Sequence, residues 1–279
     1  MRRASDVSRR INAERLLLVA WVRAILLQLA HPLIAAAVAE HSTFRGSPAA
    51  ASARLRHTVG AMIALTFGTG AERDAALEGI RAIHRRVSGT LTLASGSFAA
   101  GTRYSAEDPA LLAWVHATLT ESMVLVYEEL IAPLSSAARD RYCDDAAELA
   151  VALGASPHEV PRSWRELRAY LDRRYASGEI VVGREALMVS GALLCPIRRP
   201  WARQISTRTL TLLAAGLLPD HVRAQYGFKW NAVHAARFGR MMSLVRRVRR
   251  VLPGFIALWK RARSGDCIVV QHDYSTARR

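Results

Sequence analysis

The chain has 279 residues, of which 51% are hydrophobic, and it carries 39 Lys and Arg against 23 Asp and Glu, for a formal net charge of +16. A hydrophobic fraction of this size excludes a disordered protein and predicts one large packed domain, or two that pack closely together. The excess of arginine predicts attraction to anionic partners such as a membrane surface or nucleic acid, although a GC-rich coding bias produces the same composition.

The N-terminal region begins with the basic stretch MRRASDVSRR, followed by a long apolar segment over residues 16–39. This arrangement resembles a leader before a membrane segment, but Arg23 and Gln28 interrupt the apolar residues, and a charge inside a membrane span is costly. Pro32 also breaks any helix that starts before it. The segment therefore predicts a buried helix that is broken at Pro32, in preference to a signal peptide.

Capping signals and helical periodicity predict helices along most of the chain. The clearest helix follows Asp108 and Pro109 and covers residues 110–132. Other predicted helices cover residues 51–67 after Ser47 and Pro48, 71–87 after a glycine turn, 163–175 with a capping box of Ser163 and Glu166, and 231–252 capped by Asn231. Strand signals are confined to residues 267–274 and, more weakly, 89–96. The predicted fold class is therefore all-α, and no repeat or linker divides the chain.

The cysteines and histidines define the chemistry that is available. Cys143, Cys195 and Cys267 are too far apart in sequence for a disulfide framework or a CxxC metal site, which indicates a reducing, cytoplasmic location. No phosphate loop, dinucleotide fingerprint, HExxH motif or GxSxG elbow occurs. His84 lies on the apolar stripe of its predicted helix, where a histidine is more often a structural group than a ligand.

Several linked motifs occur in order along the chain: RAILLQLAHPLIAAAVAEHSTF, RLRHT, IHRRVSG, YSAEDPALLAWVHATLTES, and a last helical section from LLPDHVRAQYGF to residue 253. Together they resemble the family of rubber oxygenases (latex clearing proteins) and MpaB-type ER-bound oxygenases, in its bacterial branch. The resemblance covers residues 15–253, with 1–14 as a basic N-terminal extension and 254–279 as a basic C-terminal tail. It implies a single all-α domain with a globin-like core, which binds haem b and uses O2 to cleave or oxygenate a hydrophobic, isoprenoid-like substrate.

Functional residues follow from this resemblance position by position. His84 in IHRRVSG matches the proximal ligand of the haem iron, and Arg54 and Thr58 match an RxxxT pattern on the distal side. Glu40 matches an acidic residue that acts as a base on the substrate. A carboxylate there can remove a proton from an allylic carbon, and Arg54 can stabilise a developing oxyanion. Without the family, Glu40 and Arg54 would be an ordinary surface ion pair.

His57 occupies the position at which rubber oxygenases can have a lysine that caps the iron. A histidine here predicts a second metal ligand, a six-coordinate resting iron and restricted access of O2. His116 is a rival iron ligand on the strongest predicted helix, with a role beside the metal as its alternative, and Trp114 is expected to help form a pocket wall. Arg85 is expected to pair with a haem propionate, or else to lie on a solvated helix face.

Two other classes of function stay open at this point. The first is a non-catalytic helical protein that binds haem or an anionic membrane surface, and the second is a haem protein that stores, senses or transfers. Nucleic acid is not expected as a partner, because no recognised module is present. Peripheral contact with an anionic membrane is expected through a basic surface that consists of Arg246, Arg247, Arg249, Arg250, Lys260, Arg261 and Arg263.

Overall fold

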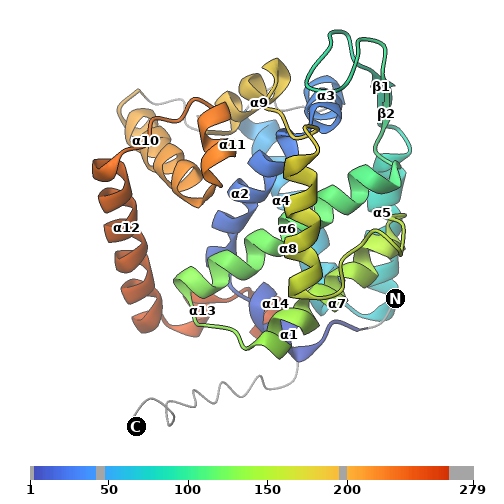
Figure 1. Ribbon diagram of the computed structural model, residues 1–279. Helices are drawn as coiled ribbons and strands as arrows, with labels where there is room; N and C mark the ends of the chain where they lie inside the picture. Colours follow the sequence, from blue (N-terminus) through green and yellow to red (C-terminus); the bar gives the residue numbers. More distant parts are fainter. Residues whose placement is uncertain (1–2, 42–47, 195–199, 264–279) are drawn as a thin grey trace.

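The computed structural model describes residues 3–41, 48–194 and 200–263, with the backbone alone for 48–55 and 200–207. The described chain is almost entirely helical, with one short β-hairpin at its edge (Figure 1). The all-α class is confirmed, while the globin-like arrangement of the core stays a prediction. The elements are α1 Asp6–Asn12, η1 Arg15–Leu17, α2 Leu18–Leu29, α3 Pro32–His41, α4 Pro48–Phe67, α5 Gly70–His84, β1 Ser88–Thr90, β2 Arg103–Ser105, α6 Pro109–Leu130, α7 Ser136–Ala152, α8 Trp164–Ala176, α9 Arg184–Leu194, α10 Pro200–Leu217, α11 Asp220–Gln225, α12 Ala232–Val251, α13 Gly254–Ala257 and α14 Lys260–Arg263.

Helix α6 runs through the middle of the molecule and organises its core (Figure 1). It begins as predicted, because Asp108 accepts a hydrogen bond from the amide of Ala110 at 2.8 Å and Pro109 occupies the first turn. Its N-terminal half packs with α2, α8 and α9 in one apolar cluster, and its C-terminal half packs with α1 and α12 in a second. Among the described helices α6 alone is long and apolar enough to cross a membrane by itself, and 78% of its apolar window is buried inside the protein.

The predicted break at Pro32 is confirmed. The chain bends there by 108° between the helical segment Arg15–Leu29, which consists of η1 and α2, and α3. His31 lies at the break and is almost fully buried, with its ring 5.3 Å from that of Phe98. A histidine beside such a break is expected to satisfy backbone carbonyls that the break releases. Its Nδ1 instead has no hydrogen-bond partner among the described residues.

Most of the predicted caps are present, with one difference in detail. Helix α5 begins at Gly70 with a complete capping box of Thr69 and Glu72, and Asn231 caps α12 by accepting from the amide of His234 at 3.0 Å. At α8 the Ser163 hydroxyl accepts from the amide of Glu166. The Glu166 carboxylate, however, reaches the amide of Arg162 rather than that of Ser163, so the predicted box is only half formed.

The β-hairpin of β1 and β2 is the only sheet in the described part of the chain. Its strands are antiparallel, and Gly89 lies opposite Tyr104. The predicted strand over residues 89–96 is therefore confined to β1, and its partner β2 carried no strand signal. The other predicted strand, over residues 267–274, lies outside the described residues.

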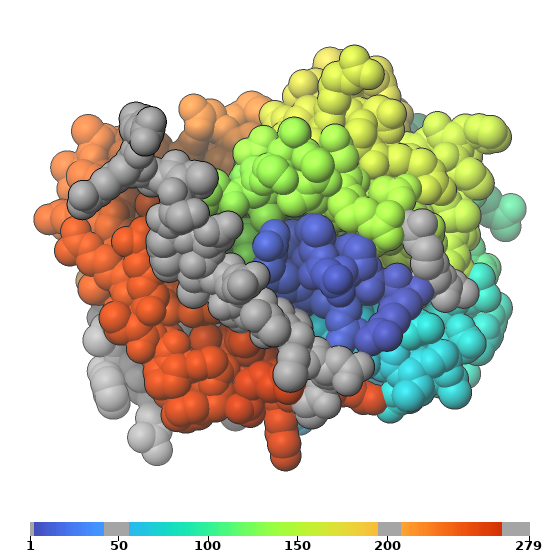
Figure 2. Space-filling view, turned by 90° about the horizontal axis from the view of Figure 1, so that it is seen from below, coloured from blue at the N-terminus to red at the C-terminus, as the bar shows by residue number. Residues whose placement is uncertain are grey.

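The C-terminal segment α13–α14 packs back onto the N-terminal part of the protein. The Trp259 amide donates to the carbonyl of Ala13 at 3.0 Å, and Arg261 forms an ion pair with Glu72 at the start of α5. Figure 2 shows the red segments α12–α14 on the same face of the molecule as the blue α1. Residues 254–263 of the predicted tail are therefore attached to the helical body.

Candidate functional site

Two of the three histidines singled out from the sequence lie near one another. His84 is the last residue of α5 and is partly buried, and His116 on α6 is 9% exposed. Burial, followed by the charge that His84 carries when protonated, lowers the pKa of His116 to about 4. Burial also lowers the pKa of His84, against the opposing effect of the Glu107 carboxylate. Both imidazoles are therefore neutral at pH 7, the form in which histidine binds metals.

The Nδ1 atom of His84 is buried and has no hydrogen-bond partner among the described residues. An imidazole that binds a metal usually donates its other ring N–H to a carbonyl or carboxylate, which orients the ring. That contact is not formed, and Glu107 acts on the ring only through its charge. A buried polar atom without a partner is costly, so a bound group that satisfies the imidazole would stabilise this region.

His116 lines a cavity of about 70 Å³ between α1, α4, α6 and α7. The wall is mixed, with a mainly apolar part formed by Met62, Leu65, Thr66, Leu119 and Leu149. A single water needs about 10–15 Å³, so the cavity holds a few waters, whereas sites for ligands of drug size measure about 300–1,000 Å³. The imidazoles suit a haem iron, whereas this cavity is smaller than a site for a ligand of that size.

A protein-only metal centre finds no support in the described part of the chain. No group of three or more His, Cys, Asp or Glu side chains there is placed to hold a metal ion. A haem iron requires only one or two ligands from the protein, because the macrocycle supplies the other four.

The low pKa of His116 predicts that the protein loses stability in acid. The unfolded imidazole titrates near pH 6.5 and the folded one near 4, so between these values the unfolded chain binds the extra proton. We expect the free energy of unfolding to fall as the pH drops from about 6.5 to 4, with His116 contributing up to about 3 kcal/mol of that loss. Denaturant unfolding at pH 7 and pH 4.5 measures it. His116→Asn should reduce the pH dependence, and the same change at the exposed His158 should leave it intact.

Glu40 lies at the end of α3 and is held by the β-hairpin. The Tyr104 hydroxyl donates a hydrogen bond to its carboxylate, and burial followed by this bond raises the pKa of Tyr104. Gly89 allows the approach, since a Cβ there would lie 2.5 Å from the Tyr104 hydroxyl and 3.1 Å from Glu40 Oε2. Because β1 begins four residues after His84, the hairpin connects the predicted base to the predicted ligand.

The RLRHT motif lies in the N-terminal half of α4. Arg54, His57 and Thr58 are three and four residues apart, which places them on one face of the helix. The side chain of Arg54 lies outside the described part, and His57 and Thr58 are exposed. A role for His57 above an iron therefore requires the bound cofactor to cover it.

In this structure Arg85 lies on a solvated helix face, which was the second of its two predicted positions. Its guanidinium is 2.7 Å from Glu78, and both side chains are at least half exposed. A propionate would have to replace Glu78 as the partner of Arg85.

The comparisons with known proteins add to this geometry. A family model described as "ER-bound oxygenase mpaB/B'/Rubber oxygenase, catalytic domain" matches residues 8–247. The chain belongs to this family. Comparison with curated proteins and with solved structures gave no significant match. The matched region runs from α1 into α12, so both histidines and Glu40 lie within the oxygenase domain.

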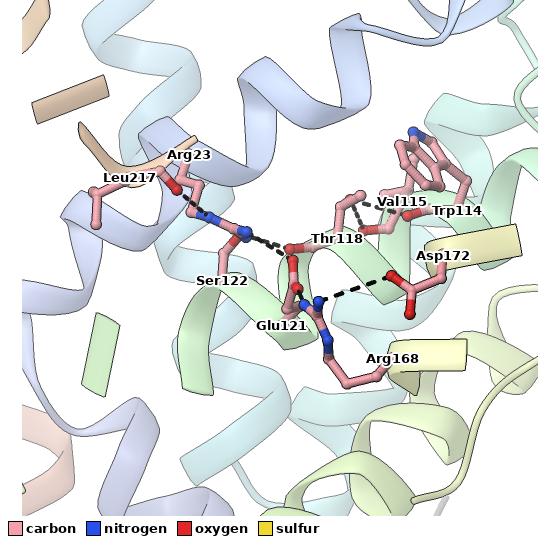
Figure 3. Close-up of polar contacts among 9 residues, drawn as sticks. All are labelled: Arg23, Trp114, Val115, Thr118, Glu121, Ser122, Arg168, Asp172 and Leu217. Carbon is pink, nitrogen blue, oxygen red and sulfur yellow. Dashed lines mark hydrogen bonds and ion pairs between the residues drawn. The ribbon is translucent and has the colours of Figure 1, made fainter. Parts of the chain in front are cut away.

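This oxygenase domain also contains a buried charge network that the sequence reasoning missed (Figure 3). Glu121 on α6 is 1% exposed and binds Arg23 of α2 at 2.8 Å on one carboxylate oxygen, and it pairs with Arg168 of α8 on the other. Arg23 also donates to Ser122 Oγ at 2.7 Å and to the carbonyl of Leu217 at 2.8 Å. The network thus joins α2, α6 and α8 to the C-terminal end of α10.

The sequence contains a signal for each partner of the central ion pair in this network. Arg23 lies within an apolar segment, where it was considered only as an argument against a membrane span, and Glu121 lies inside the longest apolar helix. Opposite charges in two apolar helices predict that the helices are neighbours. The expectation that Trp114 helps to form the pocket wall is wrong. Its side chain is fully buried against Tyr175, with ring centres 5.7 Å apart, and it does not line the cavity of His116.

Proposed function

We propose that this member of the oxygenase family depends on haem b and oxygenates or cleaves a hydrophobic, isoprenoid-like substrate with O2. The observation that carries the proposal is the pair of neutral imidazoles, His84 and His116, inside a domain of the oxygenase family. The Nδ1 atom of His84 has no partner among the described residues, so it is available to a bound group.

His84 is assigned as the iron ligand and His57 as the residue that caps the iron from α4. Haem, when bound, supplies the iron at which O2 is activated. Arg85 is assigned to a propionate, and His116 to a position beside the metal, where its imidazole stays neutral. Glu40 holds or accepts a proton at its carboxylate, Arg54 stabilises negative charge that develops on the substrate, and Thr58 completes the motif on the same face of α4.

A hydrophobic substrate agrees with the lining of the cavities. Met62 lines both the cavity of His116 and a second, smaller cavity whose wall includes Trp21, Ile63 and Trp259. The apolar part of these mixed walls is suited to contact with a hydrocarbon chain.

The visible absorption spectrum of protein expressed with ample haem precursor tests this proposal. We expect a Soret band in the wild type, its loss in His84→Ala, and its retention in His158→Ala, which removes an exposed histidine. In the same series His57→Ala should convert a low-spin spectrum to a high-spin one, since it removes the second ligand.

Oxygen consumption with isoprenoid substrates then separates the classes of function. Uptake of O2 that depends on Glu40 and Arg54 supports the oxygenase. A coloured protein that consumes no O2 with any isoprenoid would instead be a haem protein that stores, senses or transfers. A protein that stays colourless after haem is added would contradict the proposal and favour the non-catalytic alternative.

A further inference from the structure

The exposed side of α12 and α13 combines large apolar side chains with arginines. Leu244, Val248 and Val251 follow one another at helical spacing on α12, and Val251 is 80% exposed. Phe255 and Ile256 on α13 extend the row, with Phe255 62% exposed. We call these five residues the apolar row. Exposed apolar side chains that gather in this way mark a binding surface.

The arginines of α12 divide into two sets. Arg246 and Arg249 turn toward the body, where Arg246 pairs with Glu129 at 2.8 Å and Arg249 pairs with Glu14. These two, and Arg261, which pairs with Glu72, help to hold the fold. Arg247 and Arg250 are exposed beside the apolar row. The basic surface predicted from sequence is therefore smaller than expected, and its outward part coincides with the apolar residues.

These segments contain no carboxylate of their own. The sequence has no Asp or Glu from His221 to Gly265, so α12 and α14 contain arginine and lysine but no acidic side chain. A row of Leu, Val, Phe and Ile flanked by unopposed arginines matches the interface of an anionic bilayer, where the apolar groups enter the acyl region and the arginines meet phosphates. Duplex nucleic acid would use the arginines and leave the apolar row in water.

We propose that the face formed by the apolar row with Arg247 and Arg250 binds the surface of an anionic lipid bilayer. The segments α12–α14, which carry this face, are the red segments of Figure 2. Ion pairs and the backbone contact between Trp259 and Ala13 attach α12 and the C-terminal segment to the body, so the surface is presented as a rigid unit.

The position of this face bears on the candidate site. Trp259 follows Ile256 by three residues and lines the smaller cavity with Met62, which also lines the cavity of His116. A bilayer on this face therefore lies near the smaller cavity, which shares Met62 with the cavity of His116. This consequence rests on the proposed function, whereas the lipid-binding face does not.

Flotation with vesicles tests the proposal on the full chain, whether or not haem is bound. We expect binding to vesicles with 30% phosphatidylglycerol in phosphatidylcholine, little binding to pure phosphatidylcholine, and weaker binding at high salt. Arg247→Gln/Arg250→Gln should weaken binding at least tenfold, because each arginine near an anionic surface contributes roughly fivefold. Val251→Ser/Phe255→Ser should weaken it by a similar or larger factor.

Arg165→Gln/Arg173→Gln is the matched control, since it removes two exposed arginines from α8 and should leave binding unchanged. Equal losses in the control and in the α12 variant would overturn the assignment of this face. Full binding by Val251→Ser/Phe255→Ser would show that the apolar row does not insert. Absence of vesicle binding by the wild type, together with retention on duplex DNA at the same salt, would replace lipid by nucleic acid. Circular dichroism of each variant establishes that it is folded, so that a loss of binding reports on the surface.

Discussion

Replacement of Glu121 by Ala is expected to lower the free energy of unfolding by about 3–5 kcal/mol. The substitution leaves the guanidinium of Arg23, which is 3% exposed, buried without its carboxylate. Arg168 is 45% exposed and can turn to water or to Asp172, which lies 3.8 Å away, so most of the penalty comes from Arg23. Urea denaturation monitored by circular dichroism measures the difference.

Two comparisons isolate the cause of this loss. Glu78→Ala breaks an exposed ion pair with Arg85 and should change stability by no more than about 1 kcal/mol. The double variant Arg23→Met/Glu121→Leu removes both charges together and should recover much of the loss, because a buried pair is often replaceable by apolar groups of similar volume. A cost below about 1 kcal/mol for Glu121→Ala would mean that water reaches Arg23 in solution.

Replacement of Trp114 by Ala is expected to cost about 3–5 kcal/mol for a different reason. The indole is completely buried between α6 and the C-terminal end of α8, and its ring meets the edge of Tyr175. Removal of so large a side chain from the centre of the main apolar cluster leaves a cavity that the rigid helices around it only partly close. Thermal or urea unfolding measures the loss.

Trp114→Phe provides the control for this substitution. The indole Nε1 has no hydrogen-bond partner among the described residues, so phenylalanine leaves no partner unsatisfied and should cost less than about 1.5 kcal/mol. A cost as large as that of Trp114→Ala would show that Nε1 donates a hydrogen bond to a buried water. Because Trp114 does not line the cavity of His116, its Phe variant should also keep the spectrum of the wild type.

The elements that could be predicted from sequence are those fixed by local signals. The caps of α6 and α12 and the break at Pro32 each depend on residues within a few positions of one another. Strand β2 could not be predicted in the same way, since RYS becomes a strand only through its pairing with β1. The capping box at α8 is only half formed because the Glu166 carboxylate accepts from the amide of Arg162 instead of that of Ser163. The local sequence does not decide between these two neighbouring amides.

The candidate site depends on tertiary packing, so less of it could be predicted from the sequence. His84 could be identified from the apolar stripe of its helix and from the family motif. Its closeness to His116, however, arises from the packing of elements around α6. The contact of Glu40 with Tyr104 joins residues 64 positions apart, and it needs Gly89 between them. Arg23 and Glu121 were visible as charges in apolar helices, yet their pairing across 98 positions requires the fold.

The attachment of the C-terminal segment bears on the order in which the molecule is assembled. Helix α4, which carries the RLRHT motif, packs on α5, α1 and α14, and Trp259 closes the cavity beside it. During synthesis, residues 254–263 leave the ribosome after all the elements against which they pack. The packing around α4 is therefore completed only after residues 254–263 have been synthesised, and α14 and Trp259 do not cover this side of the helix before then.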